Sequence, residues 1–84
     1  MASRRIRVTG RVQGVSYRDW TRRKALGLGL DGWVRNRRDG SVEALLSGEP
    51  ARIAEMIEAC HEGPRAARVE GVEVLAEDET AEPG

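Results

Sequence analysis

The 84-residue chain lacks most of the features that mark secreted, metal-binding or membrane proteins. Cys60 is its single cysteine, so no disulfide can form within the chain, and a zinc site built on several thiolates is excluded. The first residues, MASRRIR, contain no apolar stretch of the kind found in secretory signals. No apolar run approaches the length that spans a bilayer. We therefore expect a protein of the reducing cytoplasm that has no membrane partner.

Aromatic residues are also scarce, because the chain has no phenylalanine, two tryptophans and one tyrosine. A domain of this length must build its small core mainly on aliphatic side chains. The formal net charge is zero, but residues 1–38 hold eleven basic and two acidic residues, whereas residues 39–84 hold three basic and twelve acidic ones. Two interpretations stay open. Either the halves pair their charges on folding, or the basic half attracts an anionic ligand.

Apolar spacing predicts strands and helices in the order β-α-β-β-α-β. Alternation of apolar and polar residues indicates strands at 4–12, 30–37, 41–46 and 67–75. Apolar residues spaced three and four apart indicate helices that begin near positions 17 and 50. Gly29 fits a left-handed cap at the end of the first helix, and Pro50 suits the first turn of the second. Asp39-Gly40 predicts a hairpin, and a change of phase in the last strand predicts a bulge near Gly71.

Each predicted helix has one apolar stripe and the strands have one apolar face, and the packing that buries these surfaces against each other belongs to the α+β class. It is a ferredoxin-like βαββαβ sandwich, with a four-stranded antiparallel sheet and two helices on one face. We expect a single domain over residues 1–84. Its ordered core is predicted at about 4–76, and the acidic C-terminal tail at about 77–84, without an apolar anchor, is predicted to be mobile.

The most informative segment, VTGRVQGVSYR at 8–18, passes from a strand through a glycine-bearing turn into a helix. Such a connection directs several backbone N–H groups into one hollow, where the helix N-terminus adds partial positive charge. Arg18 adds a full charge and a planar set of donors that matches phosphate oxygens. The segment therefore predicts an anion cradle, and its arginine favours phosphate.

Asn36 lies near the end of the second predicted strand, on the same face as Val34. Its side-chain oxygen could hold a water molecule beside a phosphoryl group bound by Arg18. Phosphoryl transfer asks the protein mostly for positioning and charge stabilisation. Such a pair would suffice for a substrate with a good leaving group, such as an acyl phosphate, without a metal or a strong general base.

Two separated motifs resemble the signatures of the acylphosphatase family. The run from Val8 to Arg18 is similar to the first signature, and GWVRNRRDGSV at 32–42 is similar to the second. The resemblance covers roughly residues 4–76. It implies the ferredoxin-like fold, the absence of a metal or other cofactor, and hydrolysis of a small-molecule acyl phosphate to a carboxylate and inorganic phosphate by in-line attack of water.

The resemblance also implies roles for individual residues. Arg18 and Asn36 would be the catalytic residues, with Arg18 binding the phosphate and Asn36 orienting the water. The backbone amides that bind the substrate phosphate would be those of Gln13, Gly14, Val15, Ser16, Tyr17 and Arg18. Inorganic phosphate would be both product and competitive inhibitor. Tyr17 replaces the commoner phenylalanine, and we expect its ring in the core with its hydroxyl at the rim.

The same residues also have simpler interpretations, and the same fold serves other functions. Arg18 could be a surface cation, and Asn36 could be a turn residue. An RNA-binding module or a non-catalytic regulatory module could share the fold. RNA-recognition modules stack bases on aromatics of the central strands, whereas the outward positions here are Arg5, Arg7, Thr9, Ser41, Glu43 and Leu45. We therefore expect no nucleic-acid partner. The small size and charged surface favour a monomer, and we expect a free-standing enzyme.

Overall fold

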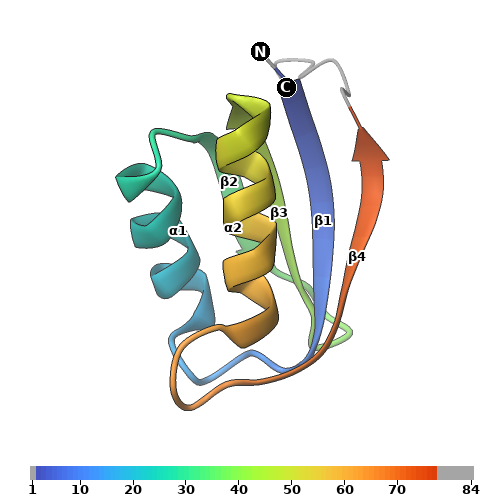
Figure 1. Ribbon diagram of the computed structural model, residues 1–84. Coiled ribbons are helices and arrows are strands. Elements are labelled where there is room, and N and C mark those ends of the chain that lie inside the picture. Colours follow the sequence, from blue (N-terminus) through green and yellow to red (C-terminus); the bar gives the residue numbers. More distant parts are fainter. Residues whose placement is uncertain (1, 78–84) are drawn as a thin grey trace.

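The computed structural model describes residues 2–77, so the predicted tail lies outside the described residues except for Glu77. The elements are β1 (Ala2–Arg11), α1 (Tyr17–Gly27), β2 (Asp31–Asn36), β3 (Val42–Gly48), α2 (Pro50–Glu62) and β4 (Arg68–Glu77). The strands form one antiparallel sheet in the order β2-β3-β1-β4, and both helices lie on the same face of it (Figure 1). The predicted ferredoxin-like α+β fold is confirmed.

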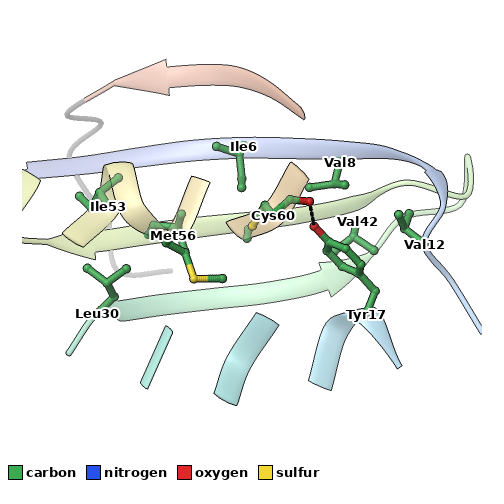
Figure 2. Packing of buried hydrophobic residues seen from close by; sticks show 11 residues of the cluster. Ile6, Val8, Val12, Tyr17, Leu30, Val42, Ile53, Met56 and Cys60 are labelled. Atoms are coloured by element: carbon green, nitrogen blue, oxygen red, sulfur yellow. Dashed lines mark hydrogen bonds between the residues drawn. The ribbon is translucent and has the colours of Figure 1, made fainter. Parts of the chain in front are cut away.

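The core lies between the two helices and the sheet face that they cover. Alternation along the central strands places Ile6 and Val8 of β1 beside Ala44 and Val42 of β3, and all four are buried. The apolar stripe of α2 packs on this face; it consists of Ile53, Met56 and Cys60 (Figure 2). Each large aliphatic side chain buried in this way contributes about 1.5–3 kcal/mol. The two central strands are therefore a rigid base for the loops at their ends.

The local signals at helix ends and turns produce the structures predicted from them. Gly29 has φ 73°, and the N–H groups of Gly29 and Leu30 donate to the carbonyls of Leu26 and Ala25 at 3.0 and 2.9 Å. This is the paired bond pattern of a Schellman cap. Pro50 is the first residue of α2. The Gly29 cap fixes the end of α1 and hence where β2 enters the sheet, and Pro50 fixes the start of α2.

The edge between β1 and β4 contains the predicted bulge. Thr9 pairs with Gly71, but the next residue, Gly10, pairs with Val69, so Glu70 is the extra residue. A Cβ atom at Gly10 would lie 2.2 Å from the carbonyl oxygen of Arg68, which explains the glycine at this position. A second shift of register, between residues 5 and 6 of β1, was not predicted.

Tyr17 differs from expectation, because its hydroxyl is buried rather than placed at the rim. The residue is 1% exposed, and its hydroxyl donates to the carbonyl oxygen of Cys60 at 2.7 Å (Figure 2). A satisfied hydroxyl can be buried at little cost. Desolvation raises the pKa of Tyr17 far above its usual value, and the neighbouring Cys60 adds to the shift. The contact ties the first turn of α1 to the last turn of α2.

The open face of the sheet also differs from expectation. Glu43 of β3 points away from the helices, yet it is 0% exposed, and its neighbours Ser41 and Leu45 are buried as well. Three arginine side chains lie across the Glu43 carboxylate and donate to it; they are Arg5, Arg35 and Arg37. The predicted direction of these side chains, away from the helices, is therefore right, but the side chains are buried and not open to solvent. Long side chains from the neighbouring strands cover β3.

Candidate active site

The loop between β1 and α1 carries backbone N–H groups that have no partner within the described residues. Gly14 has φ 73° and Ser16 has φ 63°, so two residues of this short loop adopt the left-handed conformation. Alternation of left- and right-handed residues turns successive N–H groups toward one concavity, which binds anions. The N–H of Val12 donates to Gly10, and the next backbone N–H with a backbone acceptor in the described chain is that of Trp20, at 2.9 Å from the oxygen of Ser16. The amides of residues 13–19 are thus available to a ligand.

Arg18 is the second residue of α1 and is exposed. Its sequence neighbour Asp19 pairs with Arg23, one turn along the helix, at 3.2 Å. Within residues 2–77, Arg18 itself has neither an ion-pair partner nor a side-chain hydrogen bond. Arg18 therefore follows the loop directly in sequence, and no carboxylate of the described chain neutralises its guanidinium.

Asn36 is the last residue of β2 and pairs with Val42 of β3. Strands β1 and β2 both run antiparallel to β3, so their carboxyl ends lie at the same end of the sheet. Asn36 shares a strand face with Val34, which packs against the core beneath the helices. Asn36 and the β1–α1 loop are thus at the same end of the sheet, and this loop lies at the lower edge of Figure 1.

The hairpin that follows Asn36 is closed by bonds of its own. The N–H of Arg37 donates to the carbonyl of Ser41 at 2.8 Å, and that of Gly40 donates to the carbonyl of Arg37 at 3.2 Å. Asp39 accepts from both the N–H and the hydroxyl of Ser41 at 2.9 and 2.6 Å. These bonds, chiefly that from the hydroxyl, hold the pKa of the Asp39 carboxyl below its usual value. Asp39-Gly40 is thus the hairpin turn that the sequence predicted.

Two contacts near the candidate site were not predicted from the sequence. The side-chain nitrogen of Gln13 donates to the carbonyls of Arg37 and Ser41 at 2.7 and 2.9 Å, linking the loop to the hairpin. The Glu43 carboxylate holds the side chains of Arg35 and Arg37, which flank Asn36. The sequence does contain a signal for the second contact, namely Glu43 on β3 opposite Arg35 of β2, with Arg37 two residues farther along the chain. It becomes visible only when the strand register is known.

Basic residues gather at the same end of the molecule. Arg11, the last residue of β1, pairs directly with Arg68, the first residue of β4. Like charges directly opposite each other weaken a sheet, and neither arginine has an ion-pair partner within residues 2–77. The α2–β4 loop and the β2–β3 hairpin lie at this end too (Figure 1), and they contain Arg65 and Arg38, respectively. These arginines favour the interpretation in which the basic half of the chain attracts an anionic ligand.

Residues 2–77, which the structure describes, include neither a group of metal-ligating side chains nor a helix that could span a membrane. These residues contain no cluster of three or more histidine, cysteine or acidic side chains arranged as metal ligands. Neither of the two helices has the length and apolarity required to cross a bilayer. The polar groups that the loop, Arg18 and Asn36 supply at this end of the sheet are amides, a guanidinium and a carboxamide. This set matches a tetrahedral oxyanion and a water molecule.

Comparison with known proteins points to one family. The acylphosphatase family model matches residues 4–83, a range that includes both motif segments. The acylphosphatase of Nitrobacter hamburgensis is 59% identical over 70 residues, which cover 83% of this chain and 71% of that protein. The acylphosphatase of Rubrobacter xylanophilus is 56% identical over 80 residues, which cover 95% of this chain and 71% of that protein. The crystal structure of acylphosphatase from Bacillus subtilis has a TM-score of 0.91 and 38% identity, and the match covers 98% of this chain and 90% of that chain.

Proposed function

Because the chain belongs to the acylphosphatase family, we propose that it hydrolyses small-molecule acyl phosphates to a carboxylate and inorganic phosphate. One observation carries the proposal. A loop of free backbone amides continues directly into Arg18, at the same end of the sheet as Asn36. No other place in the described chain combines an amide concavity, an unpaired guanidinium and a carboxamide.

The phosphoryl group binds in the cradle. The amides of residues 13–18 donate to its non-bridging oxygens, and the guanidinium of Arg18 adds a planar pair of charged donors. The backbone amides are held by the fold before the substrate arrives, since the adjacent Tyr17 is anchored in the core through the carbonyl of Cys60. Preorganised donors stabilise developing charge without reorganisation during the reaction.

Asn36 supplies the position of the nucleophile. Its side-chain oxygen accepts a hydrogen bond from a water molecule, whose lone pair then faces the phosphorus atom in line with the leaving oxygen. The new bond forms between the water oxygen and phosphorus. The bond between phosphorus and the acyl oxygen breaks, and its electron pair leaves on the carboxylate. The proton of the water passes to a phosphate oxygen, so no protein base takes part.

The chemistry of the leaving group sets the demands on the site. A carboxylate is a stable anion, so its departure needs neither protonation by an acid nor a metal. We accordingly propose that the enzyme works without a metal ion or another cofactor. Inorganic phosphate, which fits the same cradle, is proposed as product and competitive inhibitor.

The compartment, the oligomeric state and the extent of the domain are also matters of proposal. We propose a cytoplasmic monomer whose single domain spans residues 1–84, with its core at about 4–76. Nucleic acid is not proposed as a partner. Trp33 is the only aromatic residue on the described strands, and the guanidinium of Arg35 lies 4.8 Å from its ring centre. One aromatic side chain already covered in this way is not a platform for stacked bases.

The direct test is an assay of the purified chain with benzoyl phosphate. We expect hydrolysis that a strong chelator leaves unchanged and that inorganic phosphate inhibits competitively. p-Nitrophenyl phosphate is the control substrate, because its poorer leaving group should make it a much slower substrate. Hydrolysis that depends on an added metal would contradict the mechanism, and an inactive wild-type protein would contradict the function.

The positive field around the cradle predicts a dependence on ionic strength. We expect kcat/KM for benzoyl phosphate to fall about threefold or more as potassium chloride rises from about 10 mM to 0.5 M, while kcat changes little. The Arg11→Gln variant should flatten this slope. Arg52→Gln, which removes a cation paired with Glu55 near the start of α2, is the matched control and should keep it. A flat response in the wild type would favour mutual neutralisation of the two halves of the chain.

A further inference from the structure

We propose that the side chain of Gln13 is a positioning residue that holds Asn36 at its working distance from the phosphate cradle. This inference rests on the proposed function, because it concerns the alignment of the water with the phosphoryl group. It assigns to the Gln13 side chain a role separate from that of its backbone amide, which belongs to the cradle.

The geometry joins the two halves of the site through one carboxamide. Gln13 is a loop residue of the cradle, and its Nε2 atom donates to the carbonyl of Arg37 at 2.7 Å and to that of Ser41 at 2.9 Å. Both hydrogens of the amide nitrogen are therefore used. Within residues 2–77, these are the only hydrogen bonds between the β1–α1 loop and the hairpin.

The two acceptors are the carbonyl of Arg37, the residue after Asn36, and that of Ser41, which accepts from the N–H of Arg37 across the hairpin. In an ordinary ladder the N–H of Ser41 would donate to the carbonyl of Arg37, but here it donates to Asp39 instead. The carbonyl of Arg37 is thus left with the long turn bond from Gly40, at 3.2 Å, and the bond from Gln13. Gln13 supplies the shorter bond to the carbonyl of Arg37, the residue after Asn36.

Strand order makes such a link necessary. Asn36 lies on β2, an edge strand, and β3 separates it from β1, which carries the cradle. The spacing between Asn36 and the cradle therefore depends on the end of an edge hairpin, where strands fray most easily. A direct bond from the cradle loop to the residue after Asn36 fixes that spacing. A displacement of about 1 Å in a group that positions a reactant can cost about 100-fold in rate.

The decisive experiment is a double-mutant cycle on the full chain with benzoyl phosphate. The variants are Gln13→Leu, Asn36→Ala and their combination, beside the wild type. Gln13→Leu keeps a side chain of similar size and the backbone amide but removes both bonds. We expect kcat to fall about 10- to 100-fold in the wild-type background, while the inhibition constant of inorganic phosphate stays within about threefold. In the Asn36→Ala background, the same change should alter kcat by less than about twofold, because the group that it positions is gone.

Each outcome has a separate meaning. An equal loss of kcat in both backgrounds, or a kcat of Gln13→Leu within about twofold of wild type, would overturn the positioning role alone. Weaker phosphate inhibition in parallel with kcat would overturn it too, since Gln13 would then act on the cradle. A wild type without activity would overturn the proposed function and this inference with it. Amide hydrogen exchange adds a readout independent of turnover. Faster exchange confined to residues 37–41 in Gln13→Leu is expected, and unchanged exchange there would contradict the link.

Discussion

The Arg18→Ala variant is expected to lose about 10³-fold in kcat/KM for benzoyl phosphate and to lose measurable inhibition by inorganic phosphate. Arg18 is exposed in the first turn of α1, and no carboxylate of the described chain neutralises it. Its removal leaves the backbone amides as the only donors to a doubly charged phosphoryl group. Because that charge is present in the bound substrate and in the transition state, binding and turnover should weaken together.

The Asn36→Ala variant is the informative contrast. It should lower kcat about 100-fold while the inhibition constant of inorganic phosphate stays near that of the wild type. The reason is that the carboxamide contacts the water, not the phosphate, so its loss is felt only when the nucleophile must be aligned. The separation of the two effects, rather than their size, distinguishes a phosphate-binding residue from a water-orienting one.

Arg22→Ala is the matched control for Arg18→Ala. Arg22 is an exposed arginine on the same helix, one turn farther from the cradle. We expect its kcat/KM to stay within about threefold of the wild-type value, because only the general positive field is reduced. Similar losses in both arginine variants would assign the effect to net charge. Full activity of Arg18→Ala would refute the proposed phosphate site.

The features predicted from the sequence are those that neighbouring residues determine. Gly29 ends a helix because a left-handed residue is needed there, and Pro50 begins one because its fixed φ suits the first turn. The same holds for the cradle, since Gly14 lies in the loop and Arg18 in the helix that follows it. Such features depend on a few consecutive residues, so their pattern is visible without the fold.

The features that the sequence did not predict depend on contacts between distant segments. The hydroxyl of Tyr17 is buried because the carbonyl of Cys60, from the other helix, lies within reach. The side chain of Gln13 finds its acceptors more than twenty residues away, at Arg37 and Ser41. Glu43 appeared solvent-facing because alternation gives the direction of a side chain but not what covers it. Register and side-chain length decided these three cases.

Glu43 carries the second large effect that the structure predicts. Desolvation of its buried carboxyl would raise the pKa, but hydrogen bonds from three arginines outweigh it and lower the pKa of Glu43 from an ordinary 4.5 to about 2. A group whose pKa is depressed by folding stabilises the folded state at every pH above its unfolded value. The contribution is therefore complete above about pH 4.5 and is lost as the pH falls toward 2.

The Glu43→Gln variant should lower the free energy of unfolding by about 3 kcal/mol at pH 7. The neutral amide would leave Arg5, Arg35 and Arg37 without their shared acceptor and would direct its own donors at theirs. The cost should fall at the lower end of the range for buried ion pairs, because the three arginines are 29–62% exposed and can regain water. Against a total stability of about 5–15 kcal/mol for a small domain, this is a large fraction.

Urea unfolding of wild type and Glu43→Gln between pH 7 and pH 2 measures this contribution. The difference between the two proteins should be constant down to about pH 4.5 and should shrink below it, because the wild-type carboxyl then takes up a proton on unfolding. Glu73→Gln is the matched control, because Glu73 pairs with Arg7 at 3.0 Å in an exposed position and should contribute less than about 1 kcal/mol. If the two variants cost the same, or if the Glu43→Gln difference does not change with pH, the cluster on the open face of the sheet is only a set of surface ion pairs. A large difference that vanishes in acid means instead that one buried carboxylate organises the sheet edge that carries Asn36.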